Sequence, residues 1–117
     1  MSKMSKMTLK FAEIGPDDLG RVGGKALNLG ALARAGFRVP PGFCVTTRGF
    51  HAFVAGCPEM AALYEALDAL DPSDVAAARS LGERVRLTLE AVPLPEKLVA
   101  EIVAAWQELG PEHAYAV

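Results

Sequence analysis

One stretch of this 117-residue sequence, residues 22–47, constrains the fold more strongly than any other part, and it reads VGGKALNLGALARAGFRVPPGFCVTT. Leucine and alanine dominate residues 25–35 and give one apolar helical face, which predicts an amphipathic helix. Gly36 stands where the glycine that ends a helix belongs. The proline pair and glycine at residues 40–42 then impose an extended approach and a turn. The continuous apolar run that follows, residues 43–46, is typical of a buried strand.

Weaker patterns before and after this stretch predict another strand and several helices. Residues 9–14 form a roughly alternating apolar segment that predicts a short strand, and residues 18–22 are expected to form a loop. Thr47 is expected to cap the next helix, which ends at Gly56. Apolar stripes between proline and glycine breaks predict three more helices within residues 60–70, 75–92 and 95–109, with residues 71–73 capping the second of them, and a strand that begins over residues 113–117.

Composition and charge narrow the class of protein. Lysine and arginine number 12 against 14 aspartate and glutamate residues, which gives a formal net charge of -2. Neither sign clusters strongly, so we expect no nucleic acid and no membrane as the main partner. The two cysteines, Cys44 and Cys57, give neither a disulfide framework nor a metal-ligand spacing, which suits a reducing cytoplasm.

The N-terminus repeats Met-Ser-Lys, and its lysines interrupt any apolar run. It therefore resembles neither a signal peptide nor a membrane anchor. Residues 1–7 are expected to be disordered or an added tail, and the folded domain is expected to begin at residue 8.

The residues most suited to carry chemistry are Gly23, Gly24 and Lys25 at the start of the predicted helix. Glycines let an anion approach the backbone amides, the helix dipole is positive there, and lysine adds a mobile cation. A Walker A loop is excluded because Leu19 stands where its first glycine belongs and Ala26 replaces its Ser or Thr, and the glycines lack dinucleotide spacing. Taken alone, Gly-Gly-Lys before a helix is more often a flexible loop with a solvated lysine.

Other residues with reactive or polar side chains are expected to be structural. Trp106 lies on the apolar side of its predicted helix, which favours a core position over base stacking. Thr46 and Thr47 are explained by a strand end and a helix cap, and they are left out of the site. His51 and His113 have no partner of known role, so no catalytic residue and no metal ligand is predicted in this chain.

A set of spaced motifs from about Leu9 onward resembles a known family. The chain is similar to the N-terminal nucleotide-binding domain of the phosphoenolpyruvate synthase and pyruvate phosphate dikinase family, and rifampin phosphotransferases carry a similar domain. The set is more specific than any one of its motifs. The motifs are Val22-Gly23-Gly24-Lys25, Asn28-Leu29-Gly30, Val39-Pro40-Pro41-Gly42-Phe43 and Thr46-Thr47.

The resemblance implies an ATP-grasp-like domain of a kinase, a transferase that passes phosphate from ATP to a histidine on a swivelling domain and then to pyruvate. By resemblance, Lys25 contacts the ATP phosphates, and Gly23 and Gly24 allow their close approach. Mg²⁺ is expected for the full-length parent, with its ligands outside this chain. The implied fold class is α/β (α+β), an N-terminal subdomain fragment with few short strands and about five helices.

We therefore expect residues 8–117 to be a partial nucleotide-binding domain whose partners are ATP and the remaining domains of a parent enzyme. Ala116-Val117 resembles the lead-in to an Arg-Ser-Ser stretch of the family, which also indicates a fragment. The isolated chain is expected to lack catalysis. Two alternatives stay open: the parent transfers phosphate to rifampin or another small molecule, or the chain is a stand-alone, non-catalytic interaction module.

Overall fold

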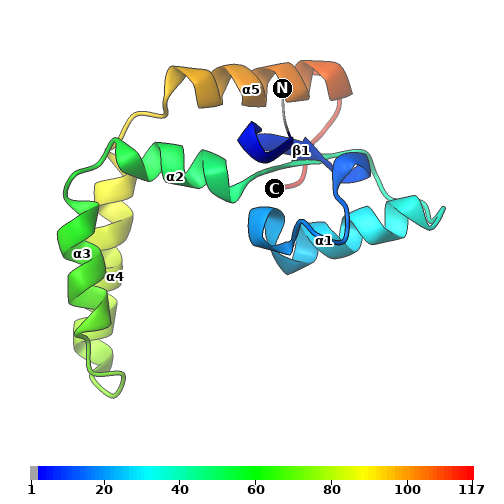
Figure 1. Ribbon diagram of the computed structural model, residues 1–117. Helices are drawn as coiled ribbons and strands as arrows, with labels where there is room; N and C mark the ends of the chain where they lie inside the picture. The colour runs from blue at the N-terminus through cyan, green and yellow to red at the C-terminus, as the bar shows by residue number, and fades with distance from the viewer. Residues whose placement is uncertain (1–2) are drawn as a thin grey trace. The chain divides into compact units, whose positions relative to one another are not determined.

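The structure is a computed structural model that describes residues 3–117 (Figure 1). It contains five α-helices and a two-stranded sheet in this part of the chain, which confirms the predicted mixed α/β class. The chain divides into two compact units, and the boundaries fall after His51 and before Glu96. The first unit comprises residues 3–51 and 96–117, and the second comprises Ala52–Pro95.

The sheet of the first unit pairs β1 (Thr8–Lys10) with β2 (Phe43–Val45) in antiparallel register, with Leu9 opposite Cys44. Leu9 is fully buried beneath it, whereas Val45 is 45% exposed. The strand β2 therefore lies where the sequence predicted it, but the expectation that this strand is buried is wrong. The two-stranded sheet gives β2 a single neighbouring strand, so its other edge has no strand partner in the part of the chain described.

The long helix α1 (Leu19–Arg34) covers the short 3₁₀-helix η2 (Phe11–Glu13) and a small apolar core. At its C-terminus, the Phe37 N–H donates to Leu32 O and the Gly36 N–H donates to Ala33 O, the two bonds of a Schellman motif. Gly36 has φ +89°, which confirms the predicted glycine cap. The core contains Leu9, Ile14 and Ala26, with Phe11, Val22, Leu27 and Cys44 packed against them.

The segment set aside as a tail takes part in the fold wherever the structure describes it, while residues 1 and 2 lie outside the described residues. Lys3 begins a 3₁₀-helix, η1 (Lys3–Ser5), and Met7 is buried. The Thr46 hydroxyl donates to Lys6 O at 2.9 Å, and the Thr46 N–H donates to Met7 O at 2.9 Å. These two bonds extend the pairing of β1 with the end of β2 back to Lys6 and Met7.

The helix α2 (Thr47–Ala55) is capped one residue earlier than expected. The hydroxyl of Thr46, and not that of Thr47, accepts the N–H of Gly49 at 3.3 Å. Thr46 is suited to this role because it is buried at the end of β2 with its oxygen directed at the first turn.

The helix α5 (Glu96–Leu109) packs against β1, and Leu98 and Ala105 are its buried residues. Trp106 is 38% exposed, so its predicted core position is wrong. The burial of a helical face depends on its neighbours, and β1 covers only part of this one. The predicted strand over residues 113–117 is also wrong, since the hydroxyl of Tyr115 folds back to donate to Gly110 O at 2.6 Å.

The second unit is a helical hairpin of α3 (Met60–Asp68) and α4 (Val75–Glu90), which lie side by side (Figure 1). The cap of α4 is Asp74, whose carboxylate accepts the Ala77 N–H at 3.0 Å. Residues 71–73 form the preceding turn instead of the predicted cap. The hairpin core contains Cys57, Met60 and Leu63, with Val54, Leu81, Val85, Leu89 and Val92 packed against it. No helix within residues 3–117 has the length and apolar character needed to cross a membrane.

The close packing of α1 on η2 predicts that Gly30→Ala destabilises the chain. A Cβ atom built on Gly30 lies 2.9 Å from the Ile14 Cβ atom and 3.0 Å from Phe11 O, and such overpacking costs about 1–3 kcal/mol. The matched control is Gly82→Ala in α4, where a Cβ atom meets nothing within 4 Å and better helix propensity adds up to about 1 kcal/mol. Urea unfolding followed by circular dichroism measures both, and equal stabilisation would contradict the packing described here.

Candidate functional site

The predicted site residues lie at a kink inside α1. Gly23 has φ 80° and ψ 176°, which separates a short first turn from the main body of the helix. This φ lies in the left-handed region that glycine adopts without strain. Gly24 and Lys25 then form the first turn of the helical segment that continues to Arg34.

Gly23, Gly24 and Lys25 are all exposed. A Cβ atom added to either glycine would meet nothing within 4 Å, so the space beside their backbone is open. The first N–H groups of a helical segment have no carbonyl partner one turn earlier, and the helix dipole is positive at that end. This arrangement of amides and one exposed ammonium group fits a small anion or a phosphate group.

Asp18, immediately before α1, fixes the turn that leads to the kink. Its carbonyl oxygen accepts the N–H groups of Arg21 at 2.8 Å and Val22 at 3.0 Å, so residues 19–22 are helical and the predicted loop there is wrong. Its carboxylate does not cap the helix. It accepts instead from Lys3 Nζ at 2.5 Å, Gly15 N at 2.7 Å and Arg21 Nη1 at 2.5 Å.

The electrostatic state of Asp18 follows from these donors. Its side chain is only 2% exposed, yet the hydrogen bonds from Lys3, from the Gly15 N–H and from Arg21 outweigh the cost of burial. They lower the pKa of the Asp18 carboxyl from 3.8 to about 2. Two cations therefore surround one carboxylate, and the cluster keeps one net positive charge close to the start of α1.

The first turn of α2 lies against the same region. The Thr47 hydroxyl donates to Gly20 O at 3.0 Å, which ties the start of α2 to the turn before the kink. The hydroxyl groups of Thr46 and Thr47 both donate hydrogen bonds to backbone carbonyl oxygens. Sequence reasoning missed Asp18, although aspartate before an apolar helical pattern is a known signal of a helix start.

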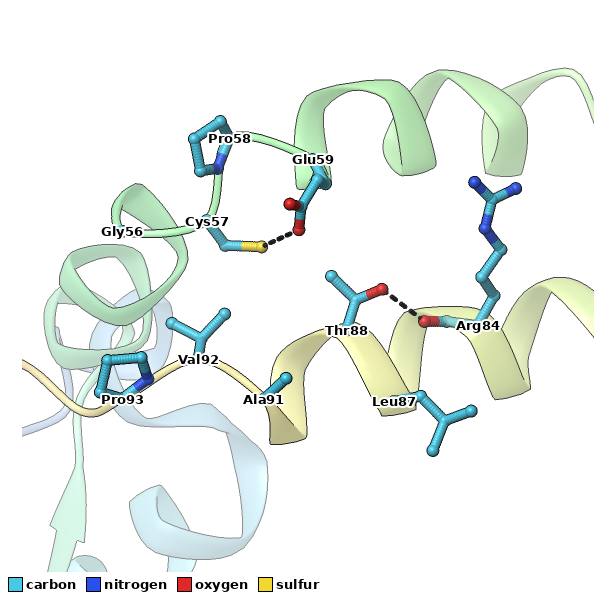
Figure 2. A pocket seen from close by; sticks show the side chains of 10 residues that line it. All are labelled: Gly56, Cys57, Pro58, Glu59, Arg84, Leu87, Thr88, Ala91, Val92 and Pro93. Atoms are coloured by element: carbon cyan, nitrogen blue, oxygen red, sulfur yellow. Dashed lines mark hydrogen bonds between the residues drawn. The ribbon is translucent and has the colours of Figure 1, made fainter.

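The second unit holds a separate open hollow of about 490 Å³ (Figure 2). Figure 2 shows the Cys57 thiol directed at Glu59, with Sγ to Oε2 at 3.5 Å. Thr88 donates its hydroxyl to Arg84 O at 2.7 Å, which satisfies it within α4. The remaining lining residues are Gly56, Pro58, Leu87, Ala91, Val92 and Pro93, so the hollow contains none of the predicted site residues.

A metal ion held by the described residues would need several side chains that could bind it together. No group of three or more histidine, cysteine, aspartate or glutamate side chains within residues 3–117 is arranged to hold a metal ion.

Comparison with known proteins assigns the chain to a family. The family described as "Pyruvate phosphate dikinase, AMP/ATP-binding domain" matches residues 19–117, which include the kink and all of the chain after it. The chain belongs to this family. The match begins at the first residue of α1, directly after Asp18.

Individual members and relatives support the same family. The chain is 39% identical over 113 residues to a rifampicin phosphotransferase of a Streptomyces species, covering 96% of this chain and 13% of the relative. It is 32% identical over 117 residues to a probable phosphoenolpyruvate synthase of Methanothermobacter thermautotrophicus, covering 97% and 17%. It is 38% identical over 103 residues to the phosphoenolpyruvate synthase of Neisseria meningitidis serogroup B, covering 85% and 13%. The chain therefore spans less than a fifth of the length of each.

The lowered pKa of Asp18 predicts a pH dependence of stability. Because the folded-state pKa is about 2 and the ordinary value is 3.8, the carboxylate stabilises the fold fully above pH 3.8, and this contribution is lost as the pH falls through 2. With partly exposed partners the contribution is about 1–2 kcal/mol. The free energy of unfolding, measured in urea at pH values from 3.8 down to 2, should fall more for the unsubstituted chain than for Asp18→Asn. Asp17→Asn, at the exposed neighbouring position, should behave like the unsubstituted chain.

Proposed function

We propose that this chain is the N-terminal part of the ATP-binding domain of a phosphotransferase of the phosphoenolpyruvate synthase and pyruvate phosphate dikinase type, and that Gly23, Gly24 and Lys25 bind the ATP phosphates. The supporting observation is the kink at Gly23, which leaves these three residues exposed at the start of a helical segment. That segment lies within the residues that match an AMP/ATP-binding domain.

In this proposal, both backbone amides and the Lys25 side chain contact the ATP phosphates. The amides after Gly23 approach a phosphate oxygen closely because no side chain at Gly23 or Gly24 intervenes. The Lys25 ammonium then neutralises charge that the amides leave uncompensated. A charge-assisted contact of this kind contributes about 1.5–3 kcal/mol. We therefore expect the isolated chain to bind ATP no more tightly than about millimolar, which corresponds to ~4 kcal/mol.

In the whole protein, we propose that the γ- or β-phosphate held here passes to a histidine of another domain and from there to pyruvate. This chain contributes binding and orientation of the nucleotide, and the remaining domains are its partners. Mg²⁺ supplies charge neutralisation on the phosphates when bound, through ligands outside the described residues. An ATP-grasp-like domain that begins near residue 8 and a cytoplasmic location are parts of the same proposal.

A second acceptor is favoured by a specific observation. Several of the similar proteins, at 34–39% identity, are rifampicin phosphotransferases. We therefore keep rifampicin as the alternative to pyruvate as the final phosphate acceptor. Incubation of the full-length protein with ATP and either acceptor distinguishes the two by which one becomes phosphorylated. A reading frame that stops after the last codon of this chain, with no turnover in either assay, would favour the stand-alone interaction module instead.

The proposed role of Lys25 predicts that Lys25→Met weakens ATP binding by about tenfold or more, because one charge-assisted contact is lost. Titration of the 117-residue chain with ATP, followed by amide chemical shifts of Gly23 and Gly24, measures this. Lys97→Met, which removes another exposed lysine, on α5, is the matched control and should leave the affinity unchanged. Equal affinities for both variants would contradict the proposed site.

A further inference from the structure

An ion pair connects the N-terminal segment to the start of α1. The Lys3 ammonium lies 2.5 Å from Oδ2 of the buried Asp18 carboxylate. Lys3 itself is followed by residues whose backbone is held elsewhere, since Lys6 O and Met7 O both accept hydrogen bonds from Thr46. The position of Lys3 is therefore set by groups that do not belong to α1.

Asp18 connects Lys3 to the residues just before the kink at Gly23. Its carbonyl oxygen holds the N–H groups of Arg21 and Val22, and its carboxylate holds the Arg21 guanidinium at 2.5 Å. Val22 is the residue before Gly23, so these bonds determine the direction in which the chain enters the kink. Gly20 is fixed from the other side by Thr47.

We propose that Lys3 is a positioning residue for nucleotide binding, which acts through Asp18 to hold Gly23–Lys25 in the conformation that receives the phosphates. This inference rests on the proposed function. Ordering the segment before the nucleotide arrives lowers the entropic cost of binding. Lys3 lies outside residues 19–117, so the N-terminal segment tunes the ATP affinity of the matched domain from outside it.

The chain offers a closely matched pair of variants for the test. Lys3→Met and Lys6→Met each remove one ammonium group from the same segment. Lys6 pairs with Glu13 at 2.7 Å and makes no side-chain contact with Asp18. A long-range effect of charge would therefore appear in both variants, whereas an effect transmitted through Asp18 would appear in Lys3→Met alone.

Two measurements are made on each variant. Amide hydrogen exchange of Arg21 and Val22, whose N–H groups donate to Asp18 O, should accelerate about three- to tenfold without nucleotide in Lys3→Met, as expected when a partly exposed ion pair is lost. The ATP affinity of Lys3→Met, measured from the amide chemical shifts of Gly23 and Gly24 during titration, should fall about two- to fivefold. Lys6→Met should leave the exchange rate and the ATP affinity unchanged. Lys3→Arg keeps the positive charge and the hydrogen-bond donors, so it should restore the exchange rate and the affinity.

Global unfolding in urea separates local release of the kink from a general loss of stability. Unchanged exchange in Lys3→Met, equal effects of Lys3→Met and Lys6→Met, or failure of Lys3→Arg to restore the exchange rate would each overturn the inference. An unsubstituted chain that does not bind ATP would overturn the proposed function. That outcome is distinguishable, because the exchange rates require no nucleotide.

Discussion

The start of α1 depends on the burial of one carboxylate. Asp18 is 2% exposed, and such a charge is tolerated in the fold only because three donors from separate places in the chain surround it. Lys3 comes from the N-terminal 3₁₀-helix, Gly15 from the preceding turn and Arg21 from α1 itself. The interaction therefore joins three consecutive parts of the chain at one point, next to the exposed glycines.

Order at Asp18 and openness at Gly23 are complementary. The turn before the kink is fixed by backbone and side-chain bonds, while the backbone at Gly23 and Gly24 faces open space. A binding segment benefits from this combination, since a rigid support presents amides without covering them. The left-handed φ of Gly23 makes the change of direction within a single residue.

Sequence patterns predicted those features that depend on neighbouring residues. The helix over residues 25–35 and its glycine cap are encoded locally, because helical periodicity and a left-handed glycine need no distant partner. The Gly23–Lys25 run could be chosen as a candidate from the sequence alone because it is uninterrupted, and its role stays a prediction. The exposure of Val45 and Trp106 was not predictable, since burial depends on which elements cover a face. The Lys3–Asp18 pair was missed because its partners are distant in sequence and one stood in a supposed tail.

The partly exposed indole on α5 has a practical consequence. Trp106 is the single tryptophan of the chain and belongs to the first unit, whereas α3 and α4 contain only a tyrosine as their aromatic residue. Intrinsic tryptophan fluorescence therefore reports on the unit that contains Gly23, Gly24 and Lys25. It is largely insensitive to unfolding of the helical hairpin. Comparing it with far-ultraviolet circular dichroism, to which every helix contributes, would reveal whether the two units unfold in one step or in sequence.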